Sequence, residues 1–101
     1  MIYITQFIYI KAGQEAVFNE FESYAIPIIS NYGGKLELRI RTPKDVRVEG
    51  TMETPDEIHL VSFPSEENFR AFLKDEERKK YVHLKEQSIE KVTMLKGINI
   101  G

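Results

Sequence analysis

The sequence predicts one α+β domain over residues 1–101, with a four-stranded antiparallel sheet and its helices on one face. Three observations lead to this fold class. Residues 2–10 are largely apolar on both faces of a strand, apolar residues recur at helical spacing over 14–32, and the stretch 62–65 ends a short strand and begins a helix. The later segments complete the order β-α-β-β-α-β. A chain of 101 residues is long enough for one core and too short for two.

The first strand and the first helix have clear patterns. Residues 2–10 are apolar on both faces, which is typical of a central strand that is covered on both sides. Residues 14–32 carry apolar side chains at helical spacing. Pro27 lies inside this helix, where it removes one backbone hydrogen bond and favours a kink. Gly33 and Gly34 then end the helix, because glycine tolerates the left-handed conformation of a C-terminal cap.

Strand periodicity continues between residues 35 and 42. Apolar residues occupy one face and charged residues the other: Leu36, Leu38 and Ile40 against Glu37, Arg39 and Arg41. We expect the charged face to meet water or a wet cavity. A turn at 42–45 follows, and residues 46–50 are expected to add a short extended piece.

The second half of the chain repeats the alternation of strand and helix. We expect a third strand over 58–63, ended by Pro64. Ser65 suits the N-cap of the next helix, because its hydroxyl can accept a hydrogen bond from an unpaired backbone N–H. The charged run 74–80 and a second helical piece follow. Residues 92–100 are expected to form the last strand.

Right-handed crossovers on this order predict the split β-α-β, or ferredoxin-like, arrangement, with both helices on one face of the sheet. The other face is left without cover. Because the first strand is apolar on both sides, that face would expose aromatic and aliphatic side chains. The chain contains no internal repeat that would supply a cover. We therefore expect a second copy of the chain to cover it, which makes a homodimer.

Composition and charge exclude several partners and chemistries. Acidic and basic side chains nearly balance at a formal net charge of −2, so we expect neither nucleic acid nor an anionic membrane as a partner. The absence of cysteine excludes disulfides and thiolate chemistry and is compatible with a reducing cytosol. The apolar run at the start lacks a basic leader and is too short to span a membrane. We expect a cytoplasmic protein.

No motif in the sequence assigns a cofactor. A glycine-rich phosphate loop, a nucleophile elbow and paired histidines at metal-ligand spacing are missing from the sequence. His83 stands in a charged helix, where a surface role is expected. We therefore predict no metal and no cofactor, and we exclude phosphoryl transfer and serine hydrolase chemistry.

Two residues are candidates for a catalytic base. His59 lies on the same face of its strand as Val61, so it points either into the helix-covered core or into a barrel cavity. A histidine in a cavity can move protons near neutral pH, although a hydrogen-bonded structural role is more common. Glu49, which precedes Gly50, could act as a base at the mouth of a cavity or could simply complete a loop.

Four further residues are candidates for ligand binding. Arg39 and Arg41 point the same way from one strand and could hold a carboxylate or an enolate. Ion pairing or a solvated edge strand would explain the same two residues, and we favour it. Phe7 and Tyr9 can line a pocket, although aromatic residues at this spacing usually fill a core or an interface.

Three short motifs follow one another along almost the whole chain: Tyr32-Gly33-Gly34-Lys35, Val48-Glu49-Gly50 and Ser62-Phe63-Pro64-Ser65. Together they resemble the dimeric α/β-barrel proteins. More narrowly, they resemble the small uncharacterised branch of that superfamily in which Tyr-Gly-Gly, Glu-Gly and Glu-Phe-Pro-Ser occur in this order. Ser62 stands where that branch usually has an acidic residue, and Lys85 stands where an arginine is expected.

The resemblance implies a homodimer whose two sheets face each other across a barrel. The superfamily includes cofactor-independent monooxygenases, isomerases of small ring lactones, haem-binding enzymes and proteins with no assigned reaction, so the fold does not select a function. Our leading hypothesis is a dimer that binds a small anionic or aromatic organic molecule in a cavity between sheet and helices. The alternatives are a cofactor-independent monooxygenase- or isomerase-type enzyme and a non-catalytic dimerisation module. Whether the protein is an enzyme stays open.

Overall fold

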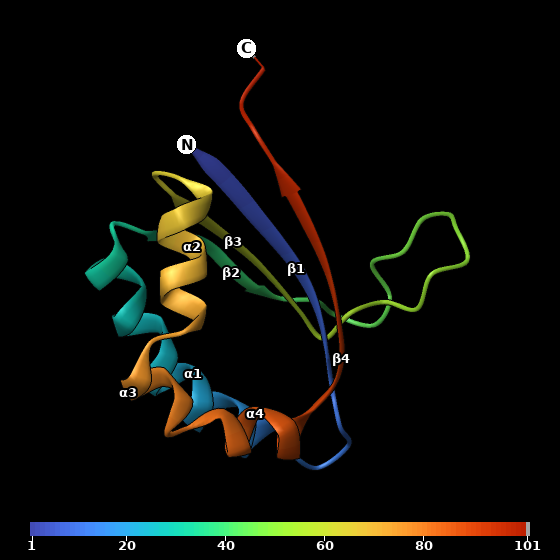
Figure 1. Cartoon of the computed structure of the whole chain (residues 1–101). Coiled ribbons are helices and arrows are strands. Elements are labelled where there is room, and N and C mark those ends of the chain that lie inside the picture. The colour runs from blue at the N-terminus through green and yellow to red at the C-terminus, as the bar shows by residue number, and fades with distance from the viewer. Residues whose placement is uncertain (101) are drawn as a thin grey trace.

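The computed structural model describes residues 1–100 and has the expected α+β fold (Figure 1). Its strands are β1 (Ile2–Ile10), β2 (Lys35–Arg41), β3 (Glu57–Phe63) and β4 (Ile89–Gly97). Its helices are α1 (Glu15–Ile29), the short 3-10 helix η1 (Ser30–Tyr32), α2 (Glu66–Leu73), α3 (Glu76–Lys79) and α4 (Val82–Ser88). Three short helices therefore stand where a single long one would complete the simplest form of this fold.

The four strands form one antiparallel sheet in the order β2-β3-β1-β4. The central position of β1 is confirmed: Ile4 pairs with Val61 of β3 on one side and with Lys96 of β4 on the other. Figure 1 shows the helices together on one side of the sheet. This arrangement leaves the opposite side of the sheet without a helical layer.

The prediction that Leu36, Leu38 and Ile40 share one face of β2 was wrong. The pairing with β3 shifts between Leu36 and Leu38, so Leu36 faces the helices while Leu38 and Ile40 face the other way. A bulge adds one residue to a strand, and each extra residue moves the following side chains to the opposite face. Arg39 therefore points to the same side as Leu36, towards the helices.

The core lies between α1 and the sheet. Phe18, Phe21, Ala25 and Ile29 are buried at helical spacing along α1. Burying a large apolar side chain of this kind contributes about 2 kcal/mol. The helix continues past Pro27 and ends through η1, and Gly33 then caps it in the left-handed conformation at φ 71°.

The Tyr-Gly-Gly motif and the Phe-Pro-Ser motif pack against each other. Ser65 caps α2 as expected, and its hydroxyl accepts a hydrogen bond from the backbone N–H of Asn68 at 3.2 Å. The side chain of Asn68 donates to the carbonyl oxygen of Tyr32 at 3.0 Å. Gly33 and Gly34 lie directly against Pro64 and Phe63. These two motifs therefore join the ends of α1 and β3, which is a structural role.

Two expected extended segments differ in the structure. Residues 46–50 form no strand but lie in the loop between β2 and β3, which projects from the sheet in Figure 1. The hydroxyl of Tyr9 donates to the carbonyl oxygen of Glu53 at 2.7 Å, which fastens the base of this loop over the sheet. The last strand begins three residues before the predicted start, at Ile89, because α4 ends at Ser88.

The side of the sheet without helices is largely apolar, and we call it the open face. It carries the apolar or aromatic side chains of Tyr3, Phe7, Tyr9, Leu38, Ile40, Ile58, Leu60 and Leu95, and the polar side chains of Thr5, Ser62, Lys91 and Thr93. Leu38 and Leu95 are 46% and 56% exposed. Within residues 1–100, no helix has the length and apolar character needed to cross a membrane.

Candidate functional site

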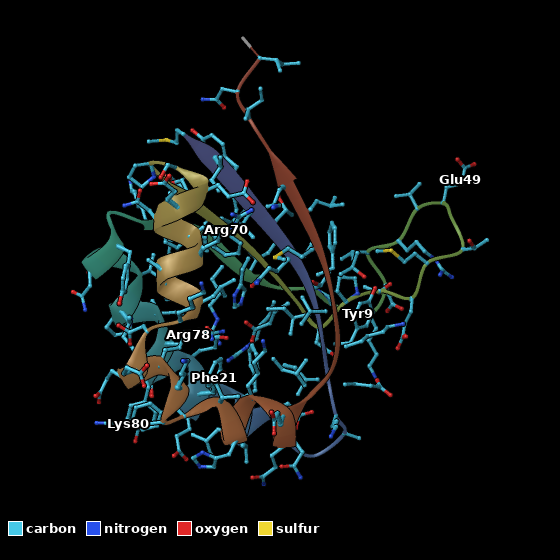
Figure 2. All side chains as sticks on the ribbon, in the orientation of Figure 1. Tyr9, Phe21, Glu49, Arg70, Arg78 and Lys80 are labelled. Carbon is cyan, nitrogen blue, oxygen red and sulfur yellow. The ribbon has the colours of Figure 1, made fainter. Side chains whose placement is uncertain are left out.

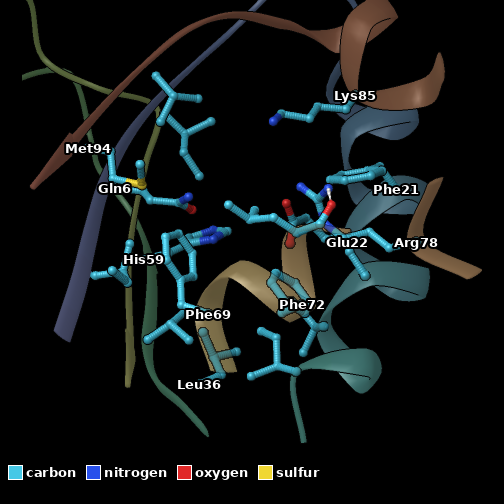
Figure 3. Close-up of a pocket in the computed structure, with 18 of the residues that line it drawn as sticks. Gln6, Phe21, Glu22, Leu36, His59, Phe69, Phe72, Arg78, Lys85 and Met94 are labelled. Carbon is cyan, nitrogen blue, oxygen red and sulfur yellow. Dashed lines mark hydrogen bonds between the residues drawn. The ribbon is translucent and has the colours of Figure 1, made fainter. Parts of the chain in front are cut away.

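A cavity of about 320 Å³ lies between the sheet and the helices (Figure 3). All four strands and the four helices α1–α4 contribute to its wall. Most of the wall is apolar, with side chains that include Ile4, Ile8, Phe21, Leu36, Phe69, Phe72, Val92 and Met94. Five polar side chains line it as well: Gln6, Glu22, His59, Arg78 and Lys85. This combination is typical of small-molecule sites, which place a few polar groups in an apolar cleft.

Arg78 and Lys85 make the helical side of the cavity cationic. Arg78 packs its guanidinium over the rings of Phe72 and Phe21, at 5.2 Å and 6.0 Å from their centroids. Its Nε is buried and has no hydrogen-bond partner among the residues described. Burial lowers the pKa of both Arg78 and Lys85, because water no longer stabilises their charges.

Glu22 brings a carboxyl group to the same cavity from α1. Its side chain is buried, and burial raises its pKa despite the opposing effects of His59, Arg39 and Arg78. Within the described part of the chain, Glu22 forms no ion pair. A carboxyl group in such surroundings holds its proton more tightly than one in water and can carry a proton in a reaction.

His59 faces the cavity, and Glu57 holds it there. The Nε2 atom of His59 lies 2.9 Å from Oε1 of Glu57, and only 1% of Glu57 is exposed. Arg39 donates to the same carboxylate through Nε at 2.7 Å, and Arg41 donates through Nε at 3.3 Å. Burial alone would raise the pKa of Glu57, but the hydrogen bonds from His59 and Arg39 outweigh it and lower the pKa to about 2.

Arg39 and Arg41 take part in this network and do not line the cavity. Both also donate to the side-chain oxygen of Asn19, at 3.0 Å and 3.1 Å. Their positive charges therefore neutralise Glu57 within one chain. The ligand-binding role predicted for these two arginines stays a prediction.

The other sequence candidates lie away from the cavity. Phe7 and Tyr9 belong to the open face, where Tyr9 is buried beneath the loop that begins after β2. Glu49 lies near the tip of that projecting loop (Figure 2) and is exposed. Of the candidates predicted from the sequence, only His59 lines the cavity.

Glu22, Glu57, Arg78 and Lys85 were missed as site residues. One signal for Glu22 was present in the sequence: it stands four residues after Phe18 and three before Ala25, inside the apolar stripe of α1. Glu57 alternates with His59 and Val61 on the buried face of β3 in the same way. The sequence contains no comparable signal for Arg78, which stands in a charged run that is typical of a solvated helix face.

The polar side chains that line the cavity can bind an organic anion more readily than a metal ion. No group of three or more histidine, aspartate or glutamate side chains within residues 1–100 is placed to bind a metal ion. Two cations and a proton-holding carboxyl instead face an apolar space. Such a site can bind a carboxylate, and it can move a proton on the molecule that it binds.

A family model, described as a domain of unknown function (DUF1330), matches residues 4–98. The chain belongs to the DUF1330 family. The match includes every residue that lines the cavity, so the candidate site lies wholly within the DUF1330 domain. No curated protein sequence matches the chain.

Solved structures share the fold of this DUF1330 protein at low sequence identity. The RPA0582 protein of unknown function from Rhodopseudomonas palustris has a TM-score of 0.86 at 13% identity, over 99% of this chain and 82% of its own. An uncharacterised NIPSNAP domain protein from Burkholderia xenovorans has a TM-score of 0.70 at 12% identity, over 99% and 95%. A putative antibiotic biosynthesis monooxygenase from Chloroflexus aurantiacus has a TM-score of 0.70 at 15% identity, over 100% and 95%. These neighbours confirm the ferredoxin-like fold class, and the family match confirms the resemblance to an uncharacterised family that the motifs indicated.

Proposed function

We propose that this DUF1330 protein binds a small organic anion with an apolar body in the cavity between the sheet and the helices. The observation that carries the proposal is the pair of cationic side chains, Arg78 and Lys85, in a largely apolar cavity. Both side chains are half-buried and form no ion pair within residues 1–100, and an anionic ligand would offset the cost of desolvating their charges. Aromatic walls at Phe21, Phe69 and Phe72 would receive the apolar part of the ligand.

The charges of the site favour an anion over a cation or a neutral molecule. Glu22 opposes two cations, and burial favours its neutral form. The Glu57 carboxylate is already engaged by Arg39, Arg41 and His59 and adds little free negative charge. A carboxylate is the simplest complement, because a guanidinium can donate two parallel hydrogen bonds to it.

The binding proposal predicts a specific effect of Arg78→Met. We expect wild-type protein to bind phenylacetate and the variant to bind it about tenfold or more weakly, since hydrogen bonds to charged groups contribute about 1.5–3 kcal/mol. Methionine retains apolar volume beside Phe72 while removing the charge. Isothermal titration calorimetry with phenylacetate measures the difference.

Arg70→Met is the matched control for that variant. Arg70 stands on α2, forms a surface ion pair with Glu66 and does not line the cavity. We expect it to leave phenylacetate affinity unchanged. Equal affinity of Arg78→Met and wild type, or no binding of any small aromatic or aliphatic carboxylate, would contradict the proposal.

We also propose that the open face is the interface of a homodimer. The apolar residues Leu38, Ile40 and Leu95 are exposed there, and a second copy of the same face would bury them. The sheets of two chains would then form the barrel that the resemblance implies. The cytoplasmic location likewise stays a prediction.

The dimer proposal is tested by the double variant Leu38→Lys and Leu95→Lys. We expect wild-type protein to be a dimer in light scattering at micromolar concentration and the variant to be a monomer that keeps its circular dichroism spectrum, because two buried ammonium groups would destabilise the interface. Ala71→Lys, on the exposed side of α2, should remain dimeric. If light scattering shows wild-type protein to be a monomer, the result contradicts the dimer proposal.

A further inference from the structure

Lys85 extends from α4 into the cavity, towards the space that Arg78 and Glu22 also face (Figure 3). Among the ion pairs within residues 1–100, none involves Lys85, whereas the surface lysines Lys79 and Lys80 each pair with a glutamate three residues earlier. Figure 2 shows Lys80 on the outside of the helical layer. The amino group of Lys85 is therefore free to meet a ligand in the cavity.

The surroundings of Lys85 favour its neutral amine. Burial lowers its pKa, because the ammonium loses its hydration. The positive charge of Arg78 lowers the pKa further, while Glu22 and Glu86 act in the opposite direction. A neutral amine is the form that attacks a carbonyl carbon, and a desolvated lysine beside a second cation is the usual way to obtain it.

We propose that Nζ of Lys85 forms an imine with the ketone carbon of an oxo acid whose carboxylate is bound by Arg78. This inference rests on the binding function proposed above and names the substrate class of that site. Arg78 and Lys85 come from successive helices, line one cavity and lie close enough for the charge of Arg78 to lower the pKa of Lys85, which suits a ligand whose ketone stands beside its carboxylate. The aromatic residues Phe21 and Phe72 complete the site by enclosing the ligand's apolar end.

The groups of the cavity account for every atom in this step. The lone pair of Nζ forms the C–N bond, and the π electrons of the carbonyl move to its oxygen, which takes a proton. The nitrogen then releases its two protons in turn and the oxygen takes up a second proton. The lone pair of the nitrogen forms the C=N bond, and the C–O bond breaks as the oxygen leaves as water. Glu22 carries these protons, since it lines the same cavity and burial raises its pKa. The step needs neither an oxidant nor a reductant.

Reductive trapping tests the proposal on the unmodified protein. Sodium borohydride converts an imine to a stable secondary amine, so protein incubated with phenylpyruvate and borohydride should carry an adduct that peptide mass spectrometry can locate. We expect labelling at Lys85 to exceed labelling at Lys80 severalfold, because burial and the charge of Arg78 lower the pKa of Lys85 and make its neutral amine more abundant. Equal labelling of Lys85 and the surface lysines would overturn the proposal without the use of any variant.

Three variants test the roles assigned to Lys85 and Arg78. Lys85→Arg should abolish the adduct at that position, and Lys80→Arg should leave labelling of Lys85 unchanged. Arg78→Met should lower the ratio of labelling by phenylpyruvate to labelling by phenylacetone, in which a methyl group replaces the carboxylate, by about tenfold. An unchanged ratio would overturn the assignment of Arg78.

Binding measured in parallel distinguishes a failure of the imine proposal from a failure of the binding function. If phenylpyruvate raises the melting temperature of the protein but does not label Lys85 selectively, the imine is excluded and the binding function stands. If neither phenylacetate nor phenylpyruvate binds, the binding function fails, and the imine proposal fails with it.

Discussion

Glu57→Gln is expected to lower the free energy of unfolding by about 3 kcal/mol at neutral pH, the largest effect of any single substitution considered for this protein. Glu57 is almost fully buried and accepts hydrogen bonds from His59, Arg39 and Arg41. Glutamine occupies the same volume but removes the negative charge that the cations face. Urea unfolding followed by circular dichroism measures the change.

The sign of the pH dependence follows from the lowered pKa of Glu57. The pKa falls from 4.5 in the unfolded chain to about 2 in the folded protein. The stabilisation is therefore fully present above pH 4.5 and is lost as the pH falls from about 4.5 towards 2. Wild-type protein should lose stability in this range, and Glu57→Gln should lose less because it has no such carboxylate.

Glu22→Gln is the matched control, because Glu22 is a second buried glutamate beside the same cations. Its pKa is raised, so folding favours its neutral form, and its contribution to stability is lost as the pH rises through that raised pKa. We expect Glu22→Gln to be neutral or stabilising at pH values where a free glutamate is ionised. Equal destabilisation by both substitutions would contradict the network centred on Glu57.

Gly34→Ala is expected to lower the free energy of unfolding by about 2 kcal/mol through overpacking. A Cβ at this position would lie 2.6 Å from Cγ2 of Ile29 and 2.6 Å from Cε1 of Phe63. Both neighbours are buried in the core and have little room to move. Urea unfolding followed by circular dichroism measures this change as well.

Gly97→Ala is the control for Gly34→Ala. Gly97 ends β4, and a Cβ there would have no neighbour within 4 Å. We expect its stability to match that of wild type within about 0.5 kcal/mol. If Gly34→Ala were as stable as Gly97→Ala, the second glycine of the Tyr-Gly-Gly motif would owe its place to something other than close packing.

The fold was predictable from the sequence because its signals are local. The two apolar faces of β1, the helical stripe of α1 and the cap at Ser65 each depend on residues close together in the chain. The bulge in β2 was not predictable, because a bulge depends on pairing with β3 and leaves the alternation of residue types unchanged. That single shift moved Leu38 and Ile40 to the open face.

The candidate site was much less predictable. His59 was identified from its residue type and its place in a strand, and it lies in the cavity. Arg39 was also singled out, but the carboxylate that engages it, Glu57, is eighteen residues away in sequence. Arg78 and Lys85 reach the cavity from α3 and α4, because the helical stretch after β3 breaks into three short helices.

The sequence by itself determined the order of the elements, the central place of β1 and the junctions that join strand to helix, because periodicity and capping act over a few residues. Only the tertiary structure decided which charges are neutralised and which are free. Whether a cation has an ionic partner depends on atoms brought together from distant parts of the chain. Glu57 engages Arg39 and Arg41, while Arg78 and Lys85 form no ion pair within residues 1–100 and face a largely apolar cavity.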